Sequence, residues 1–167
     1  GDASIYHLNK STDQFEAFPL KGDATMFYGM AMLAAPDGNL YVGTWENGLY
    51  KLNADGSAEQ LISGTLSNAV HHIHQLYCND NKSLLIASDD GLVQYDIQNH
   101  IWHMLSEVNN PSRSTSERFV YGIAGDNEGG IWVSTYYGGV NYLPSMSFEE
   151  RFRAYSARLG GLRGNVV

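Results

Sequence analysis

The sequence predicts an all-β protein built from a repeated unit, and both composition and repetition support this. The chain has 167 residues, with 11 Tyr, 6 Phe, 3 Trp and 18 Gly against 4 Pro. Aromatic residues favour strands, and glycines favour turns. The stretch Gly129–Val140 (GGIWVSTYYGGV) recurs in altered form at Asp37–Leu49 (DGNLYVGTWENGL) and Asn81–Leu92 (NKSLLIASDDGL). No stretch shows the i, i+3, i+4 apolar spacing of an amphipathic helix.

The spacing of the repeats indicates which all-β architecture is expected. Phe27, Val70, Val120 and Val166 occupy equivalent positions in successive repeats, roughly forty to fifty residues apart. A repeat of this length with four short strands is typical of a β-propeller blade. We therefore expect an all-β fold, a β-propeller fragment of three full four-stranded blades plus partial blades at both ends.

The expected blades follow one another along the chain. Residues 1–22 correspond to the back half of a blade, residues 23–63, 64–112 and 113–159 to three blades, and residues 160–167 to the start of the next. Within them, short runs of strand-forming residues alternate with turn residues. The expected strands are, in order, Ser4–Leu8, Phe15–Phe18, Met26–Leu33, Leu40–Thr44, Gly48–Leu52, one that closes near Leu61, Ala69–Tyr77, Leu84–Ser88, Leu92–Asp96, Ile101–Met104, Phe119–Ala124, Ile131–Thr135, Val140–Leu143 and Phe152–Tyr155.

The second strand of each blade carries the clearest chemical pattern. Its residues are apolar at successive positions, as in a strand with both faces buried. A small residue and then a hydroxyl follow, which allows close approach of neighbouring sheets and a local bond to the backbone. A glycine before the third strand suits a positive φ or a bulge. The apolar runs are Leu40–Val42, Leu84–Ile86 and Ile131–Val133, and the small residues are Gly43, Ala87 and Ser134. The hydroxyl residues are Thr44, Ser88 and Thr135, and the glycines are Gly48, Gly91 and Gly139.

Two of these repeats resemble a known family. The pattern Asn68-x-Val70-x-x-Ile73 … Leu84-Leu85-Ile86-Ala87-Ser88 … Gly91-Leu92-x-x-Tyr95-Asp96 resembles the two-component-regulator propeller repeat, and so does Val120–Tyr142. The resemblance extends over nearly the whole chain. It implies the periplasmic sensor region of a Bacteroidetes hybrid two-component system (histidine kinase/response regulator). Such sensors recognise glycan breakdown products and signal through a membrane helix to a histidine kinase.

The chain departs from the family pattern in sequence and in extent. Ala87 and Ser134 replace the usual glycine before the hydroxyl, and Asn79–Lys82 replaces an Asp-Gly turn. The family's propellers have roughly seven blades, more than the repeats counted here. We therefore expect a piece of a longer protein. We also expect it to self-associate through exposed blade faces, because large uncovered apolar faces are rare on soluble monomers.

Charge and cysteine usage narrow the possible functions. The formal net charge of -8 argues against a nucleic-acid partner, which would need a basic face. Cys78 is the single cysteine, so the chain forms no internal disulfide. The run Ala24–Pro36 has the hydrophobicity of a signal peptide, but it lacks a basic flank and is too short to span a bilayer. We expect a strand there, and contact with the membrane only through other regions of the protein.

Clusters that could bind a metal or carry catalysis have simpler explanations. His71, His72 and His74 form the densest imidazole cluster, and His72 and His74 would share a face of a regular strand. No Cys, Asp or Glu is spaced to complete a zinc site with them. Asp89-Asp90 and Glu149-Glu150 show no sign of the convergence that glycoside cleavage needs. We therefore expect no catalytic residue, no metal and no cofactor in this chain.

The corners between the second and third strands are the best candidates for ligand binding, because they differ between the repeats. They place aromatic rings beside carboxylates, an arrangement that suits the C–H faces and hydroxyls of sugars. The corners lie on the same face as the connections between blades, and Arg113 and Arg118 in one connection suit an acidic or sulfated sugar. The expected ligand-binding residues are Trp45, Glu46, Asp89, Asp90, Arg118, Tyr136 and Tyr137.

The sequence therefore predicts part of the periplasmic, ligand-sensing propeller of a hybrid two-component histidine kinase. The expected partner is an oligosaccharide, and the regulated genes are those for polysaccharide use. Two alternatives remain open. A secreted propeller enzyme such as a lyase predicts a convergent acid/base group on the rim, and a protein-interaction propeller predicts a broad apolar or charged face.

Overall fold

The computed structural model describes residues 5–18, 20–21, 28–61, 70–78, 82–105 and 119–144, together with the backbone of residues 153–155. These residues form strands and turns, and none of them is helical. The strands are β1 (Tyr6–Asn9), β2 (Gln14–Ala17), β3 (Gly29–Ala34), β4 (Leu40–Thr44), β5 (Leu49–Leu52), β6 (Ala58–Leu61), β7 (Ile73–Cys78), β8 (Ser83–Ser88), β9 (Gly91–Asp96), β10 (Ile101–Met104), β11 (Val120–Gly125), β12 (Ile131–Thr135), β13 (Gly139–Leu143) and β14 (Arg153–Tyr155).

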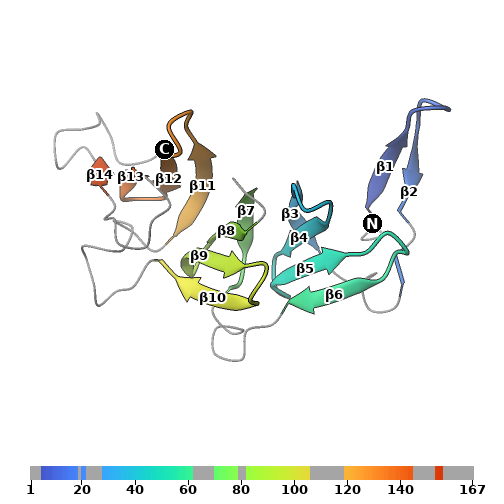
Figure 1. Cartoon of the computed structure of the whole chain (residues 1–167), viewed down its shortest axis with the longest axis horizontal. Coiled ribbons are helices and arrows are strands. Elements are labelled where there is room, and N and C mark those ends of the chain that lie inside the picture. Colours follow the sequence, from blue (N-terminus) through green and yellow to red (C-terminus); the bar gives the residue numbers. More distant parts are fainter. Residues whose placement is uncertain are drawn as a thin grey trace.

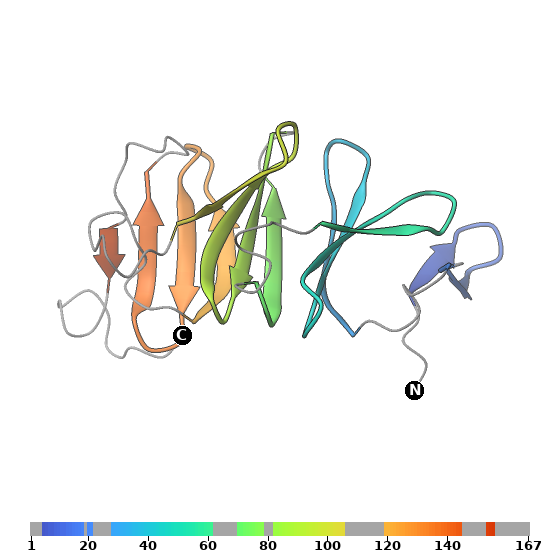
Figure 2. The same ribbon diagram turned by 90° about the horizontal axis from the view of Figure 1, so that it is seen from below.

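The strands form four antiparallel sheets, each made of consecutive strands. A two-stranded sheet, β1–β2, precedes the four-stranded sheets β3–β6, β7–β10 and β11–β14, which we call the first, second and third blades. Figure 1 shows the sheets following one another in chain order along an open arc, with β3, β7 and β11 on its inner side. In the perpendicular view of Figure 2 the sheets stand side by side. This arrangement confirms the predicted β-propeller blades.

Some of the sequence predictions fall on parts of the chain outside the described residues. Residues 62–69, 106–118 and 156–167 are among them, so the expected blade boundaries and the partial blade at 160–167 stay predictions. The expected strand within Ala24–Pro36 is confirmed as β3, which occupies Gly29–Ala34. In the described part of the chain, no helix is long and apolar enough to cross a membrane.

The core consists of apolar layers between neighbouring blades, and β8 contributes to two of them. Leu84 and Ile86 belong to the layer shared with the first blade, whereas Leu85 and Ala87 belong to the layer shared with the third. All six residues of β8 are buried, which confirms the prediction of a strand covered on both faces. Alternate residues of one strand therefore hold two blades in place.

The same prediction is wrong for one residue of the third blade. Trp132 was expected to be buried between Ile131 and Val133, but its exposed fraction is 38%. The third blade packs on the second through contacts of β11 with β7 and β8. Ile131 and Val133 face that layer, so the intervening Trp132 points to the other face of β12 because side chains alternate along a strand. There the Trp132 ring lies against the ring of Tyr142, at a centroid distance of 4.4 Å.

The hydroxyl and the glycine of the repeat form the same contact in every blade. Thr44, Ser88 and Thr135 each donate from the side-chain hydroxyl to the carbonyl of the glycine that opens the third strand, at 2.8, 2.9 and 3.1 Å. These glycines, Gly48, Gly91 and Gly139, have φ values of 74°, 129° and 79°. The predicted local hydrogen bond and the predicted positive φ are therefore both confirmed.

The turn between the first and second strands is held by an aspartate. In the first blade, the Asp37 carboxylate accepts from the backbone N–H of Asn39 at 2.9 Å and from the Tyr41 hydroxyl at 2.9 Å. In the third blade, Asp126 accepts from the backbone N–H groups of Glu128 and Gly130. Carboxylates that accept from turn N–H groups in this way stabilise the turn more when they are ionised, because hydrogen bonds to a charged acceptor are stronger.

We expect Asp37→Asn to destabilise the protein at neutral pH but not in acid. Burial raises the pKa of Asp37, but the hydrogen bonds from Asn39 and Tyr41 outweigh it and hold the pKa below its ordinary value. A pKa lowered by folding gives stability that is present above about pH 4 and is lost as the pH falls through the folded-state pKa. Denaturant titrations should show a loss of about 1 kcal/mol at pH 7 that shrinks toward zero near pH 2. An equal loss at both pH values would contradict this explanation.

Three contacts between blades depend on single residues. A Cβ at Gly43 in β4 would overlap the Cγ2 atom of Ile73 in β7 and lie 2.9 Å from its Cβ.

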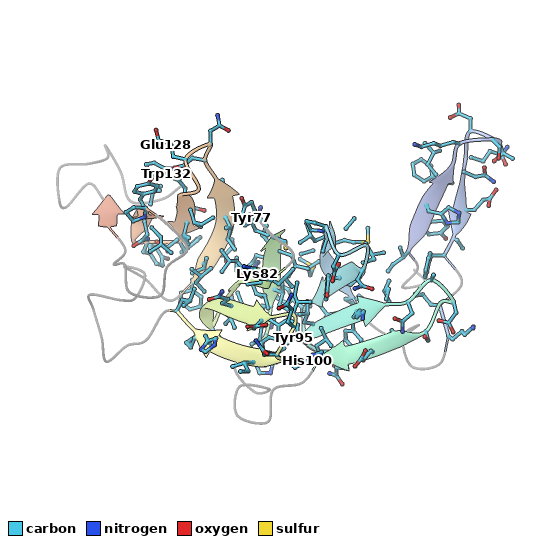
Figure 3. The ribbon with its side chains drawn as sticks, in the orientation of Figure 1. Tyr77, Lys82, Tyr95, His100, Glu128 and Trp132 are labelled. Atoms are coloured by element: carbon cyan, nitrogen blue, oxygen red, sulfur yellow. The ribbon has the colours of Figure 1, made fainter. Side chains whose placement is uncertain are left out.

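The side chain of Gln75 in β7 reaches across to β11, where its amide donates to the Ile123 carbonyl at 2.9 Å and accepts from the Ile123 N–H at 2.8 Å. Tyr77 lies on the same side of β7, beside β11 (Figure 3), where its hydroxyl fills the space next to Gly125.

Candidate functional site

In the first and third blades, a backbone hydrogen bond joins the corner between the second and third strands to the entry of the blade. The N–H of Trp45 donates to the Tyr28 carbonyl at 3.1 Å, and the N–H of Tyr136 donates to the Phe119 carbonyl at 3.0 Å. In each case the acceptor directly precedes the first strand of the same blade. The corners and the entries to the first strands therefore lie together, on what we call the corner face.

The entry to the second blade differs from the sequence prediction. The expected strand Ala69–Tyr77 is wrong at its start, because β7 begins at Ile73. The preceding residue, His72, has a φ of 49°, in the left-handed region that β-strands exclude. Its N–H donates to the carbonyl of Trp45 at 2.7 Å, so His72 is tied to the corner of the first blade.

Three histidines at this entry pair with the two aspartates of the next corner. The Asp89 carboxylate bonds Nδ1 of His72 at 2.6 Å through one oxygen and Nε2 of His74 at 2.7 Å through the other. The Asp90 carboxylate accepts from the His71 N–H at 3.1 Å and lies 3.3 Å from the Nδ1 atom of that residue. The sequence spacing did not indicate these contacts, which form because the β8–β9 turn folds back onto the start of β7.

The bridge between the two imidazoles fixes the charge of Asp89. Burial raises the pKa of its carboxyl, but the hydrogen bonds from His74 and His72 lower it by more, so that the pKa lies below the ordinary value. Asp89 is therefore an anion at neutral pH and accepts both bonds. Among the described residues, no group of three or more His, Cys, Asp or Glu side chains is arranged to hold a metal ion.

Aromatic rings continue from this cluster into both neighbouring blades. The Trp45 ring stacks on the His72 ring at a centroid distance of 4.0 Å, and the Tyr121 ring stacks on the His74 ring at 4.1 Å. Tyr136 lies 5.6 Å from Tyr121, centroid to centroid. Tyr137 lies edge-on to Tyr136 at 4.3 Å. We call these six side chains, from Trp45 to Tyr137, the aromatic row.

The aromatic row is accessible to solvent. The exposed fractions are 39% for Trp45, 43% for Tyr121, 42% for Tyr136 and 58% for Tyr137. Exposed rings of this size on one face are an unusual use of apolar surface unless something binds there. The row offers ring faces for stacking, and its imidazole nitrogens and the nearby carboxylates offer hydrogen bonds.

The structure brings together most of the residues that the sequence singled out. Trp45, Tyr136 and Tyr137 belong to the aromatic row, and Asp89 bonds its two histidines. Asp90 lies in the same turn and pairs with His71. Glu46 is exposed in the corner next to Trp45. Arg118, like Arg113, lies outside the described residues.

Sequence reasoning missed His72, His74 and Tyr121 as members of this site. The expected equivalence of Val120 with Phe27 and Val70 is wrong, because Val120 pairs with Thr135 as Gly29 pairs with Thr44 and Ile73 with Ser88. Tyr121 therefore shares its position in the blade with His74. The histidines were identified as a cluster. Their aromatic partners were not, because Trp45 and Tyr121 come from different blades.

Comparison with known proteins gives one family match and several similar structures. Residues 115–137 match the family model described as two component regulator propeller. No curated protein sequence matches the chain. The extracellular domain of the hybrid two component system BT3049 from B. thetaiotaomicron is similar over 83% of this chain and 20% of that one, with 21% identity and a TM-score of 0.69. The extracellular domain of the hybrid two component system BT4673 from the same organism is similar over 86% of this chain and 21% of that one, with 22% identity and a TM-score of 0.65.

The similar structures establish the fold and show how much of such a domain this chain covers. At these identities the likeness shows the fold alone, and the chain spans about a fifth of the length of either domain. The class of protein is thus a β-propeller with four-stranded blades. Residues 115–137 match the two-component regulator propeller repeat, in agreement with the sequence resemblance.

Proposed function

We propose that this chain is part of the periplasmic sensor region of a hybrid two-component histidine kinase. In this proposal it binds a glycan breakdown product and so controls transcription of polysaccharide-use genes. Support comes from the repeat type and from similar structures that are extracellular domains of hybrid two component systems. The kinase and its membrane helix would belong to other regions of the longer protein.

The aromatic row is the observation that carries the proposal for ligand binding. Its exposed aromatic rings come from the first and third blades, with the histidines of the second blade between them, and sugar rings stack on aromatic side chains through their C–H faces. The neighbouring carboxylates and imidazoles supply hydrogen bonds for hydroxyl groups. Arg118 is the proposed additional contact for an acidic sugar, because guanidinium groups pair with carboxylates and sulfates.

A ligand on this row could signal by linking blades. Trp45 belongs to the first blade, His72 and His74 to the second, and Tyr121 to the third. A sugar that contacts all three favours one relative position of the blades over others. The ligand shifts the equilibrium between sensor states only by its differential affinity for them.

Trp45→Ala and Tyr137→Ala should weaken glycan binding, each by about tenfold or more, because each removes an exposed stacking ring. The measurement is calorimetry with a defined panel, consisting of maltotriose, cellotriose, xylotriose and trigalacturonic acid. Trp132→Ala is the matched control, since Trp132 is as exposed as Trp45 but lies in the middle of β12, where it packs on Tyr142.

The control should bind within about twofold of the wild type, a difference close to the precision of such measurements. Unchanged affinity in both row variants would contradict the site, and so would an equal loss in the control. Absence of binding by every member of the panel would contradict the proposed ligand class.

The histidine–aspartate contacts also favour one second candidate, a secreted propeller enzyme such as a lyase. His72 and His74 bonded to Asp89 form the kind of group that acid/base catalysis uses. Incubation of the same four oligosaccharides with the protein separates the two functions. Release of shorter products would favour the enzyme, and binding without turnover would favour the sensor.

A further inference from the structure

His72 is the most constrained side chain of the aromatic row. Its backbone N–H bonds the Trp45 carbonyl, its ring stacks on the Trp45 ring with an interplanar angle of 23°, and its Nδ1 bonds Asp89 at 2.6 Å. The backbone bond fixes the position of His72, the stacking fixes the plane of its ring, and the bond to Asp89 fixes which edge of the ring faces the carboxylate. The side chain is still 33% exposed, so part of the ring remains open to solvent.

The chemistry of a carboxylate then determines where the imidazole protons sit. An ionised carboxylate only accepts hydrogen bonds, so both ring nitrogens that touch Asp89 must carry a hydrogen. For His72 this nitrogen is Nδ1, and for His74 it is Nε2. In a neutral imidazole the other nitrogen then carries a lone pair and accepts. For His72 the accepting nitrogen is Nε2, which hydrogen-bonds none of the described residues.

The two histidines differ in how they can use that second nitrogen. The His74 side chain is only 12% exposed and lies beneath the Tyr121 ring, with an interplanar angle of 14°. His72 has almost three times the exposed fraction and lies beside the exposed Trp45 ring. Of the two, His72 is therefore the one that can meet a molecule lying on the row.

We propose that Asp89 fixes the tautomer of His72, so that Nε2 of His72 accepts a hydrogen bond from a hydroxyl group of the ligand that stacks on the aromatic row. This inference rests on the proposed function and names a specificity determinant within it. Asp89 is a positioning residue, because both of its oxygens bond imidazoles. The site then selects a ligand that carries a hydroxyl donor able to reach Nε2 in the plane of the His72 ring, at the edge of its stack with Trp45. A methyl ether at that hydroxyl removes the donor and leaves the Nε2 lone pair unpaired.

The tautomer can be measured without any ligand. Long-range ¹H–¹⁵N spectra of the labelled chain near pH 7.5 distinguish an Nδ1–H imidazole from an Nε2–H imidazole. We expect the Nδ1–H form for His72 and the Nε2–H form for His74. In Asp89→Asn, one imidazole loses its acceptor because the amide offers a single oxygen, so at least one of these signals should change. Asp90→Asn is the matched control, and it should leave both His72 and His74 unchanged.

Binding of the same four oligosaccharides tests the second half of the inference. With whichever of them binds, Asp89→Asn should weaken affinity about tenfold. Asp96→Asn is the control for binding, because Asp96 pairs with Ser83 at the end of β8 that lies away from the corner face, and it should weaken affinity by less than about twofold. Among the mono-O-methyl derivatives of that oligosaccharide, one should lose affinity for the wild type but lose little further affinity for Asp89→Asn.

The outcomes separate this inference from the proposed function. An Nε2–H tautomer of His72 in the wild type would overturn the inference, and the wild-type spectrum decides this even if Asp89→Asn fails to fold. Equal affinities of Asp89→Asn and the wild type would overturn it as well. Failure of all four oligosaccharides to bind would overturn the glycan proposal, while the tautomer would still decide the role of Asp89.

Discussion

Replacing Gly43 with valine is expected to destabilise the protein by about 3 kcal/mol, at the upper end of the cost of overpacking a core. The site lies between the first and second blades, where even a Cβ at Gly43 would overlap Ile73. Ile73 is fully buried, so its side chain has no space into which it can move. Either the blades separate or β7 shifts, and both responses disturb the apolar layer that joins them.

Denaturant unfolding of a small series measures this effect. Gly43→Ala should lie between the wild type and Gly43→Val, because the overlap grows with each added methyl group. Ser134→Ala is the control at the equivalent position of the third blade, and it should change the free energy of unfolding by about 0.5 kcal/mol or less. A Gly43→Val variant as stable as the wild type would show that the blades are not in the close contact described.

Replacing Gln75 with methionine is expected to cost about 2–3 kcal/mol, because it leaves two backbone groups of the buried residue Ile123 without partners. Methionine keeps the length of the side chain, so the loss comes from the hydrogen bonds and not from a cavity. These bonds join β7 to β11, and the variant should therefore loosen the third blade from the second.

Gln60→Met provides the control for this substitution. Gln60 is exposed in β6 and makes one side-chain bond to the Asn47 carbonyl at 2.8 Å. Its replacement should change stability by about 0.5 kcal/mol or less in the same denaturant titration. Similar losses in the two variants would mean that the bridge between blades contributes no more than an ordinary surface hydrogen bond.

The architecture could be predicted from the sequence because it depends on local, repeated chemistry. The strand Ile131–Thr135 and its equivalents carry apolar residues, a small residue and a hydroxyl, and each of these features acts on neighbouring residues or on the adjacent sheet. The bond from the Thr135 hydroxyl to the Gly139 carbonyl spans four residues. Interactions of this range can be inferred from spacing alone.

Contacts between blades were less predictable, because they join residues that are distant in the sequence. Asp89 meets His72 and His74 only once the β8–β9 turn folds back onto the start of β7. Gln75 reaches Ile123, 48 residues away in the chain. The irregular entry at His72 was also missed, since its positive φ depends on a hydrogen bond to the neighbouring blade. The corner residues were chosen as candidates because they vary between repeats, but their partners could not be inferred in this way.

The central claim is that the repeated residues build the blades and that the variable residues of the corner face bind the ligand. Chemical-shift mapping of the ¹⁵N-labelled chain, titrated with the four oligosaccharides, tests it directly. We expect the largest shifts at the Trp45 indole and at the amides of His72, Tyr121 and Tyr136. Largest shifts at the opposite end of the sheets, around the Asp37 and Asp126 turns, would contradict it, and so would an unchanged spectrum with every oligosaccharide.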